Sequence, residues 1–240
     1  MDKHRLTSVS LYAFFTVSII NLLNQVVHIL WVDLLTKPLL MVTLLLYYLA
    51  ARKVEFSRIA IFMIAALVFS WFGDVLLMLQ GRLEGMFIAG LASFLIAHLF
   101  YLVVYQQARH TVVLGSYSLF ITTRTVFLLL VGFALIYMLY PSLGSLGIPV
   151  MIYTAVIISM ALAALIRRGR TTEKSFISVY SGALLFIMSD AMLAINKFLD
   201  PLVQADLLVM STYIAAQFLI VKGILFHEHA PAEADAQKGA

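Results

Sequence analysis

The chain has 240 residues, of which 63% are hydrophobic and 12% are charged, about half the charged fraction of a typical soluble domain. The apolar residues extend over the whole length, so the composition predicts a polytopic membrane protein, and the modest net charge of +4 does not suggest nucleic-acid binding. The absence of cysteine excludes disulfides and thiolate metal sites.

Eight apolar runs each come near the length that a helix needs to cross a bilayer, about 20 residues. In chain order they cover residues 9–30, 34–51, 58–79, 86–107, 118–140, 148–166, 176–198 and 202–226. The sequence therefore predicts an all-α fold, a polytopic membrane helix bundle with eight transmembrane helices. A short polar N-terminus (1–8) precedes this transmembrane domain (9–227), and a disordered polar tail (228–240) is expected to follow it.

The basic residues predict how these spans are oriented. An even number of spans places both termini on one side, and 13 of the 16 Lys and Arg residues then fall on that side. Because basic loops remain in the cytoplasm, both termini are expected to be cytoplasmic. We expect an integral multi-pass protein of the inner (cell) membrane of a bacterium.

Two carboxyl groups lie inside predicted spans. Asp74 lies about 8 Å below the outer end of the third span, and Asp190 roughly 12–14 Å below the outer end of the seventh, at ~1.5 Å per residue. A carboxyl at membrane depth is costly unless it faces a partner or a wet cavity. The pair is therefore the first candidate for a functional site.

Other polar residues concentrate between the middle of the membrane and its outer side. They are Asn24 and His28 in the first span, Lys37 in the second, His98 and Tyr101 in the fourth, and Tyr213 and Gln217 in the eighth. Such residues are often interhelical hydrogen-bonding groups, and His98 is as compatible with a structural role as with a functional one. Glycines 73, 90 and 182 indicate close helix packing. The layer as a whole predicts one polar cavity that opens outward.

The residue types limit the chemistry of this cavity. A zinc hydrolase needs a set of His and carboxylate ligands, and only His98 lies well inside the membrane, so we expect neither a metal nor another cofactor. A serine triad is poorly supported because no G-x-S-x-G turn is present. Two carboxyls favour acid–base chemistry, with one protonated in an apolar pocket and the other ionised and able to stabilise positive charge.

Four motifs, in order along the chain, resemble those of one known family. They are GDVLLML (73–79), F-x-x-G-L-x-x-F-x-x-A-H-x-x-Y (87–101), GALLFIMSD (182–190) and Y-x-x-A-Q-x-L-I (213–220), and the pair Lys37-Pro38 also fits. Together they resemble the lysoplasmalogenase family of integral membrane proteins, also called YhhN. The resemblance covers residues 34 to 222.

The resemblance implies an ether hydrolase that cleaves the vinyl ether bond of lysoplasmalogens to a fatty aldehyde and glycerophosphoethanolamine or glycerophosphocholine. The family's catalytic aspartates map onto Asp74 and Asp190. We expect Asp190 to be the general acid, because it lies deeper, although the two roles can be reversed. The expected partners are the lysophospholipid substrate and membrane lipids.

The remaining polar residues receive auxiliary roles in this hypothesis. His98, Tyr101, Tyr213 and Gln217 are expected to orient the carboxyls or the attacking water, and Lys37, with Asn24 or His28, to meet the phosphate. Two other classes of protein stay open. One is a proton-coupled transporter that uses Asp74 and Asp190 as carriers, and the other is a lipid-binding bundle without catalysis.

Overall fold

The computed structural model describes residues 3–52, 57–81, 83, 85–109 and 119–230, and these form an all-α bundle. The helices are α1 (Lys3–Val27), α2 (Leu30–Ala51), α3 (Arg58–Met78), α4 (Met86–Gln107), α5 (Leu119–Leu143), α6 (Gly147–Ile166), α7 (Glu173–Phe198) and α8 (Ala205–Glu228). Each predicted span overlaps one of these helices. Residues 231–240 of the predicted tail lie outside the described residues, and Glu228 is the last residue of α8.

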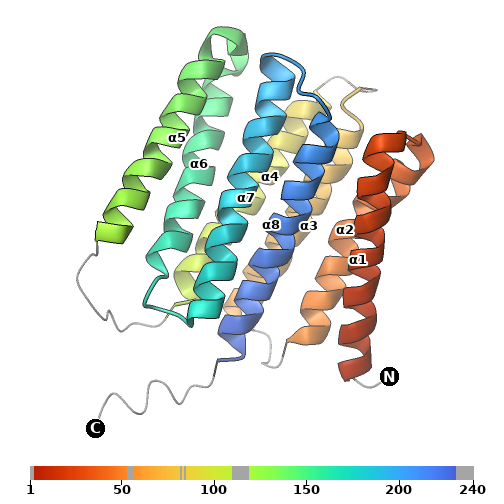
Figure 1. The fold of residues 1–240 in the computed structure, drawn as a ribbon, viewed down its shortest axis with the longest axis vertical. Helices are drawn as coiled ribbons and strands as arrows, with labels where there is room; N and C mark the ends of the chain where they lie inside the picture. Colours follow the sequence, from red (N-terminus) through yellow and green to blue (C-terminus); the bar gives the residue numbers. More distant parts are fainter. Residues whose placement is uncertain (1–2, 53–56, 82, 84, 110–118, 231–240) are drawn as a thin grey trace.

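The number of membrane-length helices differs from the sequence prediction of eight spans. Within the described ranges, seven helical stretches are long and apolar enough to cross a membrane, and one of them, Leu119–Ile166, has 48 residues. The break between the predicted spans 118–140 and 148–166 is itself helical, because α5 continues to Leu143 and the 3-10 turn Gly144–Leu146 leads directly into α6. Gly144 has a φ of +52°, which lets the chain reverse there, so α5 and α6 pack side by side (Figure 1).

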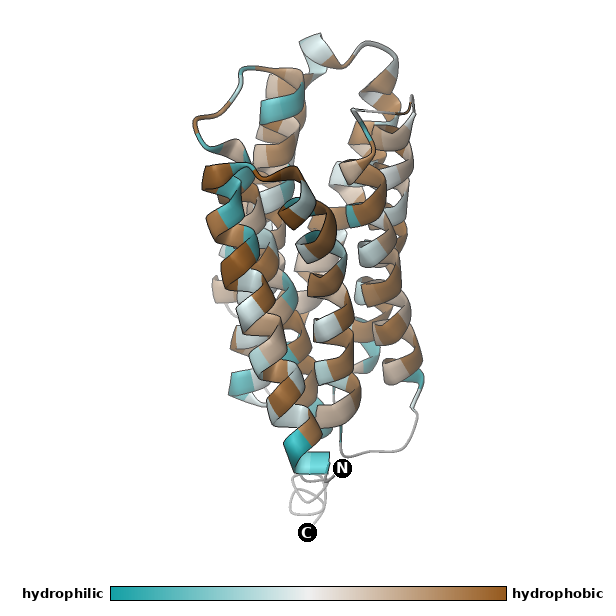
Figure 2. Cartoon of the chain, turned by 90° about the vertical axis from the view of Figure 1, so that its right-hand side faces the viewer, coloured by the Kyte–Doolittle hydropathy of each residue, from teal (hydrophilic) through white to brown (hydrophobic). Residues whose placement is uncertain are grey.

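The helices lie side by side along the long axis of the molecule (Figure 1). The pairs α3–α4 and α7–α8 form the centre, while the α1–α2 hairpin and α5 lie at opposite edges. Hydrophobic residues occupy most of the length of the helices (Figure 2), and many of their large apolar side chains are exposed. The protein is thus an integral membrane protein with several membrane-length helices, whose outer surface suits lipid.

Glycines bring the central helices close together, as the sequence predicts. A Cβ atom on Gly73 would lie 2.5 Å from the Phe94 ring of α4, and one on Gly90 would lie 2.8 Å from Leu77 of α3. A Cβ atom on Gly182 would lie 2.9 Å from the backbone oxygen of Ala216 in α8. These contacts fix the spacing of the helices that carry Asp74 and Asp190.

The contact at Gly182 leads to a stability prediction. Gly182→Ala should lower the free energy of unfolding by about 1–3 kcal/mol, because the new methyl group meets backbone atoms that cannot move aside. Thermal unfolding in detergent, followed by circular dichroism, measures the effect. Gly81→Ala is the matched control, since a Cβ atom there has no neighbour within 4 Å. Equal melting temperatures for the two variants would contradict the close α7–α8 contact.

Buried polar contacts join four helices at the end of the bundle opposite the two aspartates. Arg167, which follows α6, is fully buried, and its Nε donates to the backbone oxygen of Ala108 at 3.0 Å. Its Nη2 donates to Ser175 Oγ at 2.8 Å, and Ser175 Oγ donates to the backbone oxygen of Gly223 at 2.7 Å. Burial lowers the pKa of Arg167 to about 10, so the guanidinium remains charged at neutral pH.

Candidate active site

Asp74 of α3 and Asp190 of α7 line the same polar pocket, near the end of the bundle away from the termini. Its empty volume is about 690 Å³, and its wall also includes Lys37 of α2, Asn196 of α7 and Asp206 of α8. The close packing of α3 on α4 and of α7 on α8 brings together two aspartates that are 116 positions apart in the sequence. The pocket is thus lined by three carboxyl groups, of which Asp74 and Asp190 lie within helices α3 and α7, and by one ammonium group.

A buried hydrogen-bond network holds Asp74. Tyr213 of α8 donates its hydroxyl to Asp74 Oδ2 at 2.8 Å. Next to it, the Tyr101 hydroxyl donates to Gln217 Oε1, and Gln217 Nε2 donates to Ser70 Oγ at 3.0 Å. Ser70 and Asp74 are four residues apart, so they share one face of α3. Tyr101, Tyr213 and Gln217, predicted as site residues, therefore lie together behind this carboxyl.

Asp190 has different neighbours. The Tyr153 hydroxyl of α6 donates a hydrogen bond to Asp190 Oδ2, and His98 Nε2 of α4 lies 3.9 Å from the same oxygen. The His98 ring is fully buried and meets the rings of Tyr153 and Phe186 edge-on, at centroid distances of 5.4 and 4.6 Å. Neither His98 nitrogen has a hydrogen-bond partner among the residues that the structure describes. Because buried polar atoms usually have partners, a water between His98 and Asp190 would satisfy both groups.

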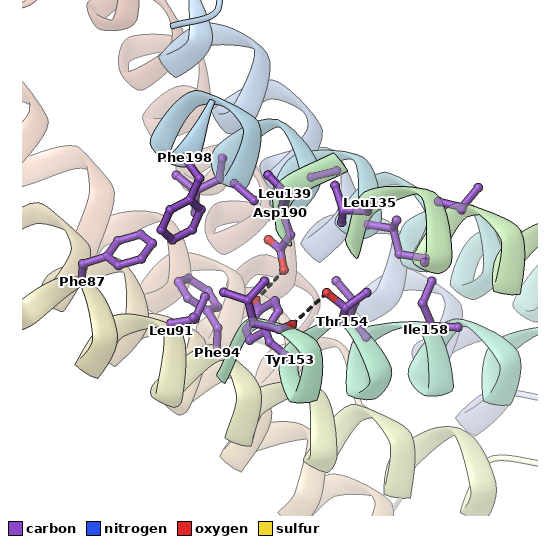
Figure 3. A pocket seen from close by; sticks show the side chains of 18 of the residues that line it. Phe87, Leu91, Phe94, Leu135, Leu139, Tyr153, Thr154, Ile158, Asp190 and Phe198 are labelled. Carbon is purple, nitrogen blue, oxygen red and sulfur yellow. Dashed lines mark hydrogen bonds between the residues drawn. The ribbon is translucent and has the colours of Figure 1, made fainter. Parts of the chain in front are cut away.

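Asp190 also lines a second pocket, which is almost entirely apolar (Figure 3). This pocket has an empty volume of about 670 Å³ and extends among α4, α5, α6 and α7, from Phe198 to Ile158. It shares Leu77, Phe94, Asp190 and Leu193 with the polar pocket. Of its described lining residues, only Asp190 is charged. Asp190 therefore lies at the junction between a polar pocket and an apolar one.

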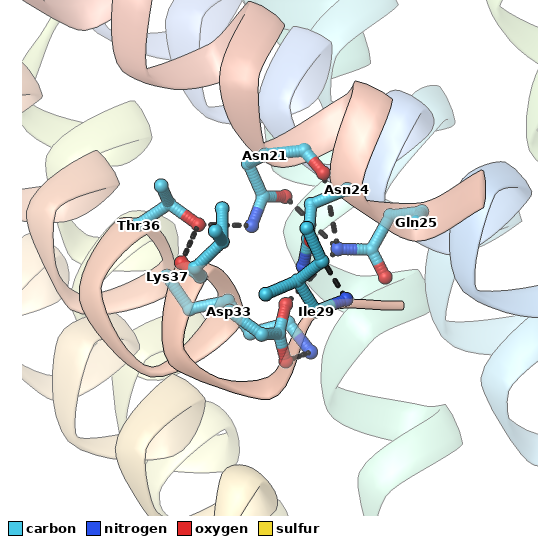
Figure 4. A network of polar contacts seen from close by, with 8 residues as sticks. Asn21, Asn24, Gln25, Ile29, Asp33, Thr36 and Lys37 are labelled. Atoms are coloured by element: carbon cyan, nitrogen blue, oxygen red, sulfur yellow. Dashed lines mark hydrogen bonds and ion pairs between the residues drawn. The ribbon is translucent and has the colours of Figure 1, made fainter. Parts of the chain in front are cut away.

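Lys37, which lines the polar pocket, belongs to a network of polar contacts in the α1–α2 hairpin (Figure 4). Its Nζ lies 2.8 Å from Asp33 Oδ2, one helical turn earlier. Gln25 Nε2 donates to Asp33 Oδ1 at 3.1 Å, and Asn21 Nδ2 donates to Thr36 Oγ1 at 2.8 Å. These contacts attach α1 to α2 and hold the first turns of α2 in place, which positions the Lys37 ammonium.

Asn24 and His28 lie outside the polar pocket. Asn24 Oδ1 accepts a hydrogen bond from the backbone N–H of Ile29 at 3.0 Å and so closes the turn between α1 and α2. His28, with a φ of +61°, lines a neighbouring pocket that shares Asn196 and Asp206 with the polar pocket. Asn24 has a clear local partner, whereas His28 lines the neighbouring pocket.

Tyr153 is the functional candidate that sequence reasoning missed. It lies six residues from the first residue of α6, deeper than the aromatic residues that usually mark a membrane interface. Nothing in its local sequence distinguishes it from other tyrosines, because its partner Asp190 is on another helix. Ser70, which accepts from Gln217, was missed for the same reason. Depth within a span is the one sequence signal that separates Tyr153 from Tyr140, which is 61% exposed.

The sequence profile of the YhhN family matches residues 32–224, a range that includes both aspartates, Lys37 and Tyr153. The chain belongs to the YhhN family. The resemblance found in the four sequence motifs is thereby confirmed. No solved structure matches this YhhN protein.

Several relatives of this YhhN protein are named lysoplasmalogenases. Lysoplasmalogenase TMEM86A of Homo sapiens is 36% identical over 158 residues, which cover 64% of this chain and 61% of that protein. Lysoplasmalogenase TMEM86B of Homo sapiens is 34% identical over 160 residues, which cover 67% of this chain and 62% of that protein. The chain therefore matches about three-fifths of the length of these relatives.

Proposed function

We propose that this YhhN protein is a lysoplasmalogenase, which hydrolyses the vinyl ether bond of a lysoplasmalogen. The observation that carries the proposal is the position of Asp190 at the junction of an apolar and a polar pocket, with a second carboxyl and Lys37 in the polar one. A lysoplasmalogen has one hydrocarbon chain and one glycerophosphate head, joined by the vinyl ether. The junction therefore corresponds to the bond to be cleaved. The names of the relatives agree with this activity.

The two pockets suggest how the substrate lies. The hydrocarbon chain occupies the apolar pocket among α4, α5, α6 and α7, and the glycerophosphate occupies the polar pocket. The Lys37 ammonium meets the phosphate, and His28 borders the opening through which the head group extends. Asn24 contributes indirectly, since it holds the α1–α2 turn that positions Lys37.

Asp190 is the general acid in this proposal. Its protonated carboxyl transfers a proton to the β-carbon of the vinyl ether, which leaves an oxocarbenium ion and the Asp190 carboxylate. Water adds to the cationic carbon and gives up its proton to a carboxylate, which yields a hemiacetal. The hemiacetal breaks down to a fatty aldehyde and the glycerol alcohol, and the acid is restored. The apolar lining beside Asp190 favours the neutral acid before the reaction.

Asp74 stabilises the positive charge of the intermediate. It shares its pocket with the Lys37 ammonium and accepts a hydrogen bond from Tyr213, both of which suit an ionised carboxylate. Tyr101 and Gln217 hold the network beside it, and His98 orients the water near Asp190. None of these steps requires a cofactor or a metal.

Tyr153 leads to the next prediction. Its hydroxyl donates to Asp190 and stabilises the carboxylate that forms as the proton leaves, so Tyr153→Phe should lower kcat roughly tenfold with little change in KM. Aldehyde release under saturating lysoplasmalogen measures the effect. Tyr137→Phe is the matched control, because Tyr137 is 76% exposed on α5. An unchanged kcat for Tyr153→Phe would remove this residue from the mechanism.

We also infer that the 48-residue stretch crosses the membrane twice, which gives eight crossings. The side-by-side packing of α5 and α6 supports this inference. Both termini then lie on the cytoplasmic side, where the basic residues concentrate. Such a protein suits the inner (cell) membrane of a bacterium.

The activity itself is tested by incubating the purified full chain, in detergent, with a lysoplasmalogen and with a saturated alkyl-ether lysolipid of equal chain length. The proposal predicts aldehyde from the first lipid and none from the second, because only a vinyl ether can be protonated at carbon. Absence of aldehyde from both lipids with folded protein would contradict the proposal. Vesicle uptake that depends on Asp74 or Asp190 would then favour the transporter.

A further inference from the structure

A separate basic groove lies at the end of the bundle that holds the termini. We define it by Lys3 and His4 of α1, Tyr47 of α2, Lys222 and Phe226 of α8, and His229 directly after α8. Its empty volume is about 1160 Å³, larger than either pocket at Asp190. The groove is far from the proposed active site, since Lys3 begins α1 and His229 follows α8, whereas Asp206 at the opposite end of α8 lines the polar pocket.

The basic groove has an excess of positive charge. Two lysines and two histidines line it, and none of the described lining residues is acidic. Glu228, next to His229, is instead buried, where it accepts a hydrogen bond from the Tyr48 hydroxyl at 3.0 Å and lies 3.5 Å from Arg52 Nε. Its charge is therefore matched by Arg52. Among the described lining residues, Lys3 and Lys222 supply positive charge and no acidic residue offsets it, which favours an anion in the groove.

Aromatic side chains lie beside the groove: Phe218, four residues before Lys222 on α8, has its ring centroid 6.3 Å from that of Tyr47, which lines the groove. Lys222 Nζ lies 5.6 Å from the centre of the Phe218 ring and 5.8 Å from that of Phe226. Phe218 packs on Phe14 and Phe15 of α1, with ring centroids 5.7 and 5.1 Å apart. A ligand in the groove thus meets cations at the membrane surface and aromatic rings below them, which is the polarity of a phospholipid.

The groove also lies mostly outside the family match. The YhhN profile covers residues 32–224, and Lys3, His4, Phe226 and His229 fall outside that range. Most of its described lining residues come from α1 and the end of α8, whereas the residues that line the two pockets of the proposed active site lie between α2 and α8. Ligand binding in the groove is therefore a feature of this chain and not a part of ether hydrolysis.

We propose that the basic groove binds the phosphate head group of an anionic phospholipid. Lys3 and Lys222 provide the permanent charges, and the acyl chains run along Phe218 and the exposed apolar side chains of α1. The bound lipid joins α1 to α8, which otherwise contact each other much less than α7 contacts α8. The lipid thereby stabilises the position of the α1–α2 hairpin, which carries Lys37.

Native mass spectrometry of the full chain in detergent tests this site. The protein is incubated with phosphatidylglycerol or with zwitterionic phosphatidylcholine, and the lipid that stays bound is counted. Wild type should retain phosphatidylglycerol in preference to phosphatidylcholine. Lys3→Gln with Lys222→Gln should weaken phosphatidylglycerol binding roughly thirty-fold, and Lys3→Arg with Lys222→Arg should preserve it. Equal retention of the two lipids by wild type, or full retention by the Gln variant, would overturn the proposal.

Two controls separate this site from general surface charge and from a soluble anion. Arg170→Gln with Lys174→Gln removes two charges near the same end of the bundle, outside the groove, and should leave lipid retention unchanged. An equal loss in this control would attribute the binding to surface charge and overturn the site. Inorganic phosphate, added as a competitor, should displace little lipid because it lacks acyl chains. Complete displacement at comparable concentration would assign the groove to a free phosphate instead.

Discussion

Asp190→Asn is expected to lower the turnover of a lysoplasmalogen roughly a thousandfold, since it removes the acid that protonates the vinyl ether carbon. Asparagine has almost the same shape and can still accept the Tyr153 hydrogen bond, so the bundle should fold normally. The measurement is aldehyde release per mole of purified protein, with melting temperature as the test of folding. KM should change little, because the pocket walls remain.

Asp200→Asn is the matched control for this experiment. Asp200 follows α7 at the same end of the bundle, is exposed, and lines neither the polar nor the apolar pocket. Its removal should leave turnover unchanged. If folded Asp190→Asn keeps activity close to that of wild type, Asp190 does not transfer the proton, and the assignment of the two aspartates must be reversed or abandoned.

Asp74→Asn should reduce turnover roughly a hundred- to a thousandfold, for a different physical reason. It removes the negative charge that stabilises the oxocarbenium ion in a largely buried pocket, where electrostatic effects are stronger than in water. Asparagine can still accept from Tyr213, so the effect should appear in kcat rather than in stability. Steady-state kinetics over a range of lysoplasmalogen concentrations separates the two parameters.

Asp33→Asn provides a comparison for Asp74→Asn. Asp33 pairs with Lys37 but does not line the polar pocket, so its loss should affect head-group binding, seen in KM, more than kcat. If both variants changed only KM, the proposal that the Asp74 carboxylate stabilises the oxocarbenium ion would be wrong, because a carboxylate that acts on the intermediate must affect the chemical step.

The helices could be predicted from the sequence because a membrane requires apolar runs of fixed length. Each of the eight predicted spans overlaps a helix, and Gly73, Gly90 and Gly182 lie at close contacts as predicted. Among the described residues, the count of membrane-length stretches is seven because the turn at Gly144–Leu146 is helical. A Gly/Pro-rich sequence does not distinguish such a tight helical turn from an open loop.

The site could be predicted only where a residue type is unusual for its depth. Asp74 and Asp190 stand out in any apolar run, and the structure places both on one pocket. The depth of Tyr153 separates it from tyrosines at span ends but does not predict its role, because that role depends on a partner from another helix. The junction of the two pockets arises from the packing of α4 to α7, which depends on contacts far apart in the sequence.

Deuterium labelling tests the central claim most directly. The purified protein is given a lysoplasmalogen in D₂O with EDTA present, and the released aldehyde is analysed by mass spectrometry and compared with that formed in H₂O. Proton transfer to carbon predicts one deuterium on the carbon beside the carbonyl group, with slower turnover in D₂O and no effect of EDTA. Folded protein that releases no aldehyde, or aldehyde without this deuterium, would contradict acid-catalysed vinyl ether hydrolysis.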